Sequence, residues 1–154
     1  MPETAGVDGR EARVPFQLIE VDGPSMVPTL YPGDWMLVQH GARVRPGDVV
    51  ILRHPLQQDL LVVKRAVERR EGGWWVLGDN PYNTGGDSNV YGVVPEELVL
   101  ARVRGRFRPL TRVRQEREAA GRSQLSLGAL ASWAVSAVRP VLADRSVSKR
   151  LRAR

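Results

Sequence analysis

Short apolar runs separated by turn residues dominate the first two thirds of the chain. Between Phe16 and Leu110 each run is bounded by Gly, Pro or Asp, a pattern typical of β-strands joined by turns. The runs are Phe16–Val21, Trp35–Gln39, Val49–Arg53, Leu60–Val67, Trp74–Leu77 and Val99–Arg108. The pattern predicts a mainly β domain built from antiparallel strands.

Local signals place several of these strands. The run Val99–Arg108 alternates apolar residues with arginines, which predicts a strand with one wet face. Pro-Gly-Asp occurs at 32–34 and again at 46–48, each time as a turn that leads into a run. The glycines at 72–73 predict a hairpin between residues 60–69 and 74–78. No helical periodicity is found before residue 112.

The last third has a different character. Residues 111–122 are charged, and we expect them to be flexible or loosely helical. An apolar residue then recurs every three or four positions up to Val141, which predicts a helix that Pro140 interrupts or ends. The positions are Leu127, Leu130, Ala134, Ala137 and Val141. The chain therefore divides into a flexible leader (1–15), a β domain (16–110) and a basic, partly helical tail (111–154).

Charge separates the tail from the domain. Residues 1–101 hold nine Lys/Arg and fourteen Asp/Glu, a net charge of −5, whereas residues 102–154 hold fourteen and three, a net charge of +11. Such a tail is either a solvated extension or a contact for an anionic membrane, nucleic acid or an acidic protein. A helix packed on the domain and an interfacial membrane helix both remain open.

Targeting signals are absent from the pattern. The first eighteen residues lack the apolar core of a secretory signal. The least polar stretch, Leu125–Val138, is shorter than the roughly 20 residues of a spanning helix. We therefore expect a cytoplasmic protein without a transmembrane anchor, with peripheral membrane contact through the tail as the alternative. The absence of cysteine excludes disulfides and thiolate chemistry.

Ser25 is the candidate nucleophile. It lies in Gly23-Pro24-Ser25-Met26-Val27-Pro28, where two prolines restrict the backbone and Gly23 permits a close approach. A nucleophilic serine needs such a rigid position together with a base. Taken alone, the segment is more often an ordinary turn.

Lys64 is the candidate base. It follows the apolar residues of Leu60–Val63, and burial of a lysine lowers its pKa toward the range of a proton acceptor. The alternative is a lysine on the wet face of a strand. Because neighbouring strand residues point to opposite faces, we expect Arg65 to face the solvent instead. His40 and His54 stand in no catalytic context and are expected to be ordinary loop or surface residues.

A long polar loop at residues 78–92 is rich in Asp, Asn and Gly. Its plainest interpretation is a network of turns in which Asx side chains bind backbone amides. A calcium loop through Asp79, Asn83 and Asp87 is disfavoured because no bidentate glutamate follows at the required spacing. We expect neither a metal site nor a cofactor.

Taken in order, these segments resemble the signal peptidase I (S26) family of Ser–Lys serine proteases. The resemblance covers about residues 16–104 and consists of a nucleophile box at 23–30, Arg45-Pro46-Gly47-Asp48-Val49-Val50, Val63-Lys64-Arg65, and Gly78-Asp79-Asn80 with Asp87-Ser88. It implies a signal-peptidase-like antiparallel β domain. The departures are Gly23 in place of an oxyanion serine, Asn89 in place of an arginine, and the missing N-terminal anchor.

The resemblance also implies roles. Lys64 would take the proton of Ser25, the Ser25 amide beside Gly23 would hold the oxyanion, and Met26 would lie near the substrate groove. Asp79, Asp87 and Ser88 would be structural supports. The chain is most similar to the subgroup that removes the leader of nickel-type superoxide dismutase, which makes that precursor the expected substrate. Two alternatives stay open: a self-cleaving Ser–Lys regulator cut near Ala5-Gly6, and a non-enzymatic basic β module that binds nucleic acid, which lacks the expected stacking aromatics.

Overall fold

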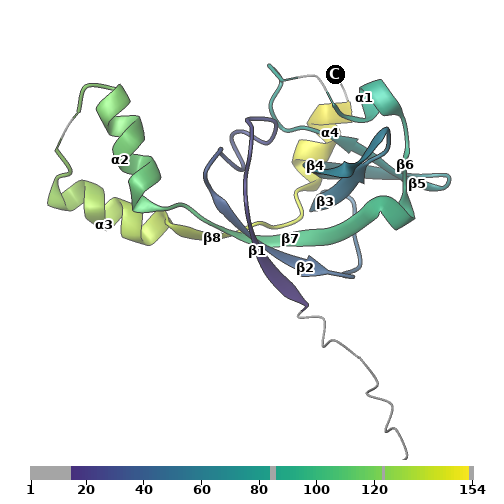
Figure 1. The fold of residues 1–154 in the computed structure, drawn as a ribbon, viewed down its shortest axis with the longest axis horizontal. Coiled ribbons are helices and arrows are strands. Elements are labelled where there is room, and N and C mark those ends of the chain that lie inside the picture. Colours follow the sequence, from purple (N-terminus) through teal and green to yellow (C-terminus); the bar gives the residue numbers. More distant parts are fainter. Residues whose placement is uncertain (1–14, 84–85, 123, 153–154) are drawn as a thin grey trace, which may run out of the picture.

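A computed structural model describes residues 15–83, 86–122 and 124–152. The predicted leader therefore lies outside the described residues except for Pro15. Within them, one sheet runs in the order β1-β2-β7-β3-β4-β5-β6, and β8 pairs with β7 (Figure 1). The strands are β1 (Phe16–Glu20), β2 (Trp35–His40), β3 (Val49–His54), β4 (Gln57–Arg70), β5 (Gly73–Leu77), β6 (Val94–Pro95), β7 (Val99–Phe107) and β8 (Val138–Pro140).

Every pair in the sheet is antiparallel, so the predicted mainly β fold is confirmed. β4 and β5 form the expected hairpin, with Arg70 opposite Gly73. β7 shows the expected alternation in its centre, where Ala101 and Val103 are buried and Arg104 is exposed. The period of two therefore holds in the centre of β7 but fails at Phe107, which it puts with the buried residues and which is exposed beyond a register shift of the β2–β7 pair.

β3 contributes to two of the hydrophobic clusters that hold the sheet. Val49 and Ile51 belong to the first cluster, which also contains the turn between β1 and β2, whereas Val50 and Leu52 belong to the second, around Trp74. A strand whose alternate side chains enter different clusters is buried on both faces, which explains the unbroken apolar run of β3. β3 is therefore a central support for β4, its partner on one side.

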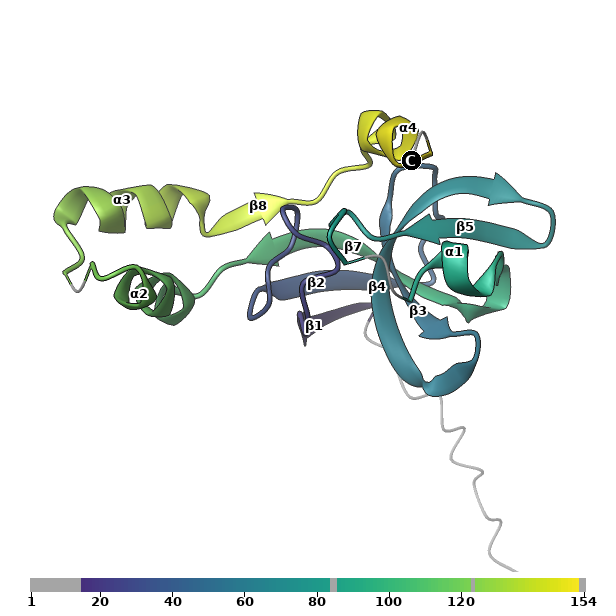
Figure 2. The ribbon, with the colours of Figure 1, turned by 90° about the horizontal axis from the view of Figure 1, so that it is seen from above.

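Five helical segments follow or interrupt the strands: α1 (Ser88–Tyr91), η1 (Glu96–Leu98), α2 (Leu110–Ala119), α3 (Leu127–Ser136) and α4 (Arg145–Arg152). Two views show α2 and α3 projecting together from one end of the sheet, joined to it through β7 and β8 (Figures 1 and 2). α4 returns to the sheet, where Leu151 packs with Val67 and Leu77. No helix in the described ranges is long and apolar enough to cross a membrane.

The predicted helix through Val141 is wrong beyond Ser136. Val138–Pro140 forms β8, in which Val138 lies opposite Phe107 and Pro140 opposite Gly105. A β-branched valine and a proline without an N–H suit an edge strand better than a helix. α2 agrees with the loosely helical character expected of residues 111–122, whereas no periodicity predicted the single-turn α1.

Part of the predicted tail contacts the sheet. Val141 is buried in the first cluster, and the Asp144 N–H donates to the Gly47 carbonyl at 3.1 Å. The two backbones are so close that a Cβ on Gly47 would lie 2.8 Å from Asp144. The boundary at residue 110 stays a prediction.

The packing of α4 leads to a stability prediction. Leu151→Ala removes a buried side chain from the cluster with Val67 and Leu77, so we expect the free energy of unfolding to fall by about 2 to 3 kcal/mol. Urea denaturation followed by circular dichroism measures it. Leu142→Ala, at an exposed leucine, is the matched control and is expected to change stability by less than about 0.5 kcal/mol. Equal losses in both variants would contradict the packing of α4.

Candidate active site

The turn between β1 and β2 presents Ser25. The Met26 carbonyl accepts from the Leu30 N–H at 2.9 Å, and both side chains are fully buried in the first cluster. Gly23 has φ of 78°, a conformation that L side chains rarely adopt. Ser25 itself is partly exposed. The buried side chains of Met26 and Leu30 thus hold the turn on the core, and Ser25 between them and Gly23 stays partly exposed.

Lys64 lies in β4, opposite Val50 of β3, and only 4% of it is exposed. Among the described residues no hydrogen bond or ion pair reaches its ammonium group. Burial disfavours the charged form and therefore holds the pKa of Lys64 below its ordinary value, while the nearby carboxylate of Asp87 partly opposes this shift. Burial dominates, so the amine is a better proton acceptor than a surface lysine.

Ser25 and Lys64 line the same cleft, of about 220 Å³. One wall is the end of β1 and the residues after it, and the other is the first half of β4; the lining includes Ile19, Val21, Leu60 and Val63. No hydrogen bond joins the Ser25 hydroxyl to Lys64 in the described residues. Such contacts are often long in an unliganded protein and tighten with substrate.

Gly78 lies between the backbone of Ser25 and the side chain of Lys64. A Cβ at this position would lie 2.8 Å from the Ser25 carbonyl oxygen and 3.7 Å from the Lys64 Nζ. The first distance is too short for any real side chain. The absence of a side chain at Gly78 therefore allows the turn that carries Ser25 to approach β4.

Arg65, the neighbour of Lys64, does not face the solvent as expected. Its side chain is 2% exposed and forms two hydrogen bonds with the carboxylate of Asp79, Nε to Oδ1 at 2.8 Å and Nη2 to Oδ2 at 2.6 Å. Residues 63–67 are buried without a break, so both faces of β4 are covered here and neither is wet. The expectation failed because strand alternation cannot tell what covers each face.

Arg65 and Asp79 connect three loops. Arg65 also donates to the Gly47 carbonyl at 2.6 Å, and Thr29 of the nucleophile turn donates its hydroxyl to Asp79 at 2.5 Å. Asn80, which sequence reasoning left without a role, donates its backbone N–H to the Ser25 carbonyl at 3.0 Å and its side-chain amide to the Pro24 carbonyl at 2.9 Å. Its place directly after Asp79 in the Gly-Asp-Asn segment was the available signal.

Asp87 and Ser88 order the far end of the polar loop. The Asp87 carboxylate accepts from the Asn89 N–H at 2.9 Å and caps α1, and the Ser88 hydroxyl accepts from the Val76 N–H of β5 at 2.8 Å. Burial, helped by Asp87, raises the pKa of Tyr91 well above its ordinary value. These contacts attach the polar loop to β5 and hold the Asp87 carboxylate near Lys64.

The other candidates lie elsewhere. Met26 is fully buried in the first cluster and is not among the residues that line the cleft, so it supports the turn from inside. His40 pairs with Gln17 at 2.9 Å, and the ring of His54 packs against Tyr91. Neither histidine lines the cleft. The described residues contain no group of three or more His, Asp or Glu placed to hold a metal ion.

The buried pair leads to a second stability prediction. Asp79→Ala leaves the guanidinium of Arg65 buried without its partner, so we expect a loss of about 3 kcal/mol in the free energy of unfolding, measured by urea denaturation. The matched control is Glu96→Ala, which breaks the exposed Arg69–Glu96 pair and is expected to cost less than about 1 kcal/mol. A small effect of Asp79→Ala would show that the pair does not hold the loops.

Comparison with known proteins agrees in part with the motifs. No curated protein matches the chain. A protein-family model described as Peptidase S24-like matches residues 11–85, just under half of the chain. This family is related to the signal peptidases I that the motifs resemble but is not the same family. The matched span includes Ser25, Lys64 and Asp79 and ends before Asp87, so over the part that holds the cleft the chain is similar to S24-like serine peptidases.

Proposed function

We propose that the chain is a Ser–Lys serine endopeptidase that removes an N-terminal leader from a protein precursor. The observation that carries the proposal is a buried lysine, Lys64, that lines the same cleft as Ser25. A nucleophilic serine needs a base within reach, and a desolvated lysine can serve as that base. The similarity to S24-like peptidases supports the same reaction class.

The proposed reaction begins with neutral Lys64. Its Nζ takes the hydroxyl proton of Ser25 while the Ser25 Oγ forms a bond to the scissile carbonyl carbon. When the tetrahedral intermediate collapses, the C–N bond breaks and the Lys64 ammonium returns the proton to the leaving amine. Water then attacks the acyl carbon while Lys64 accepts a proton from it; the bond from the acyl carbon to the Ser25 Oγ breaks, and the Lys64 ammonium returns the proton to Oγ, which regenerates Ser25.

The backbone of the nucleophile turn supplies one oxyanion donor. Among the described residues the Ser25 N–H donates no hydrogen bond, so it is free for the developing negative charge. The contacts of Asn80 with the Pro24 and Ser25 carbonyls hold this peptide group in place. One preorganised donor of this kind is worth about 3 kcal/mol in the transition state.

Two unpaired strand edges border the cleft. Among the described residues β1 pairs only with β2, and β5 pairs with β4 only from Arg65 onward, which leaves the outer edge of residues 57–64 without a strand partner. An extended peptide binds such edges through its own backbone groups. Apolar side chains from both walls, among them Ile19 and Leu60, would limit which substrate side chains enter.

The substrate that we propose is the precursor of nickel-type superoxide dismutase. This choice rests on the resemblance of the motifs and on the two free edges, which suit an extended leader better than a folded surface. The self-cleaving alternative places its site at Ala5-Gly6, which lies outside the described residues. Incubation of the purified chain alone separates the two, since only self-cleavage shortens it.

Substitution of the two proposed catalytic residues tests the mechanism. Ser25→Ala and Lys64→Ala are each expected to lower kcat/KM for precursor cleavage at least about 10³-fold, because each removes a participant in proton transfer or bond formation. Intact mass of the product measures cleavage. Lys149→Ala, at the other lysine of the chain, is the control and should cleave normally. Cleavage that survives Ser25→Ala would overturn the mechanism.

The pH profile tests the base. Activity should rise with pH as Lys64 loses its proton, along a limb below the usual lysine range. Asp87 raises the pKa of Lys64, so Asp87→Asn should lower it further and shift the limb of kcat/KM to lower pH. Asparagine keeps an acceptor for the Asn89 N–H. A limb that stays in place or moves to higher pH would contradict the assignment of Lys64.

A further inference from the structure

We propose that the outer face of β1–β2–β7–β8, continued by α3, docks on an anionic lipid surface. This inference goes beyond the proposed protease activity and does not rest on it. The strand register brings exposed apolar side chains into two adjacent rows: Leu18 lies opposite Leu37, and Trp35 lies opposite Phe107, which lies opposite Val138. We call this set, with Phe16, the apolar face; its members are Phe16, Leu18, Trp35, Leu37, Phe107 and Val138, all exposed.

The apolar face is separate from the core and from the cleft. Directly opposite residues of antiparallel strands point to the same side, and successive residues point to opposite sides. Ile19 and Met36, which alternate with the apolar face, instead pack in or against the first cluster and line the cleft. A partner on the apolar face therefore leaves the cleft open on the other side of β1 and β2.

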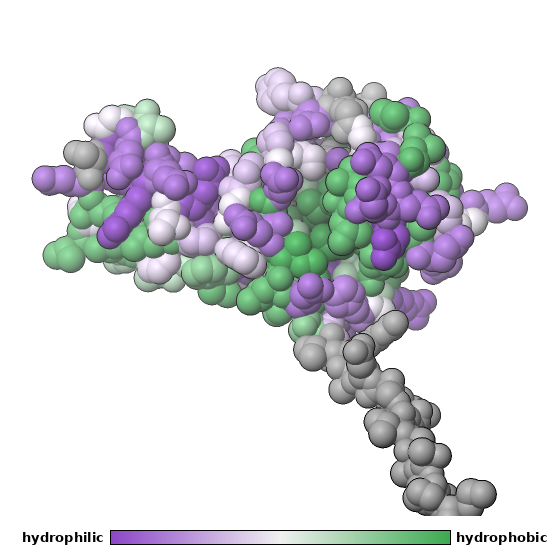
Figure 3. Space-filling view, in the orientation of Figure 1, coloured by the Kyte–Doolittle hydropathy of each residue, from purple (hydrophilic) through white to green (hydrophobic). Residues whose placement is uncertain are grey.

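α3 extends the apolar face away from the sheet. Leu127 and Val135 are 85% and 84% exposed, and their spacing of eight residues puts them on one side of the helix. Val138 follows three residues later at the start of β8. Apolar side chains cover α3 and continue along the lower edge of the molecule, whereas hydrophilic ones cover α2 (Figure 3). An apolar surface of this extent marks an interaction site rather than scattered exposed residues.

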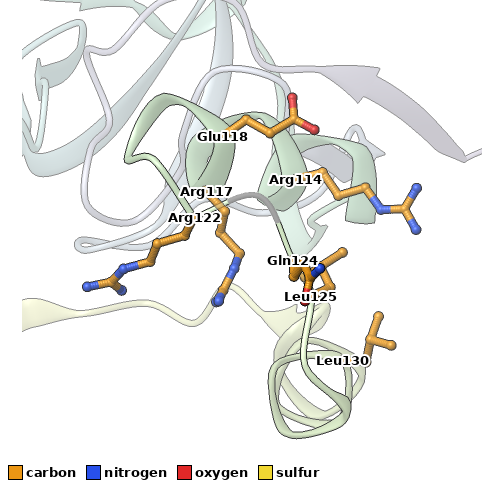
Figure 4. Close-up of a pocket in the computed structure, with 7 residues that line it drawn as sticks. All are labelled: Arg114, Arg117, Glu118, Arg122, Gln124, Leu125 and Leu130. Carbon is orange, nitrogen blue, oxygen red and sulfur yellow. The ribbon is translucent and has the colours of Figure 1, made fainter.

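Unpaired arginines lie beside α3. Arg114, Arg117 and Arg122 line, with the single acid Glu118, a hollow of about 470 Å³ between α2 and α3, and none of the three arginines forms an ion pair within the described ranges. The Arg117 Nε is buried without a hydrogen-bond partner. Figure 4 shows the Arg117 side chain entering the space between α2 and α3, whereas the Arg122 side chain extends sideways from the turn after α2. These groups provide strong donors for an anion close to an apolar surface.

The apolar face and the arginines together indicate which partner binds. An anionic membrane offers acyl chains for the apolar face and phosphate groups for the arginines in one surface. Nucleic acid offers phosphates but no apolar layer of this extent. A second copy of the chain would cover the apolar face but offers no phosphate groups for the arginines. The lipid surface is the partner that satisfies both observations.

Vesicle sedimentation of the full chain tests the proposal. We expect binding to vesicles of phosphatidylcholine and phosphatidylglycerol in equal parts, weakening as salt is added, and no binding to phosphatidylcholine alone. Absence of binding to the anionic vesicles would overturn the proposal. Equal binding to both kinds of vesicle would overturn the role of the arginines.

Variants at exposed positions locate the surface. Leu127→Glu with Val135→Glu should weaken vesicle binding more than about tenfold, since two apolar side chains that enter the lipid surface are replaced by charged ones. The matched control, Leu56→Glu with Val90→Glu, changes the same residue types at exposed positions outside the apolar face and should bind as wild type. Circular dichroism establishes that each variant is folded. Equal losses in both pairs would contradict the assigned surface.

A second pair tests the arginines. Arg117→Gln with Arg122→Gln should weaken binding about fivefold for each charge, whereas the control Arg43→Gln with Arg45→Gln removes the same net charge away from α2 and should have little effect. Equal losses would mean that only net charge matters and would overturn the site. A dimer in analytical ultracentrifugation that Leu127→Glu with Val135→Glu dissolves would assign the apolar face to a second copy, which also overturns the proposal.

Discussion

The buried ion pair of Arg65 and Asp79 is the contact on which the geometry of the cleft depends. Arg65 reaches the Gly47 carbonyl as well as Asp79, and Asp79 in turn accepts from Thr29. Three loops that are distant in sequence therefore meet at one guanidinium. Since a buried guanidinium needs nearly all of its donors satisfied, none of these loops can move alone without exposing an unpaired charge.

This constraint explains how Lys64 stays buried although Ser25, which lines the same cleft, is partly exposed. Lys64 precedes Arg65 in β4, so the strand that carries the ammonium is held by its neighbour. The nucleophile turn is held through Thr29, and the loop after β5 is held through Asp79. Arg65 thus supports the arrangement without touching the cleft, because it is not among the lining residues.

Sequence patterns sufficed where the physics is local. Alternation located β7, turn residues located the β4–β5 hairpin, and the apolar run before Lys64 indicated its burial. They failed where a distant segment decides the outcome. Arg65 is buried because loops at Gly47 and Asp79 cover it, and Val138–Pro140 is a strand because β7 is available some thirty residues earlier. The spacing of apolar residues in the tail carries no information about the edge of β7 with which Val138–Pro140 pairs.

The close approach at Gly78 has a consequence for how the two proposed catalytic groups can be tuned. A single methyl group there would overlap the Ser25 carbonyl and lie in contact with the Lys64 amine. The approach of the Ser25 backbone to β4 is therefore limited by a residue to which no chemical role is assigned. Any side chain at position 78 therefore requires the backbone at Ser25 to shift, so this glycine limits how close the turn lies to β4.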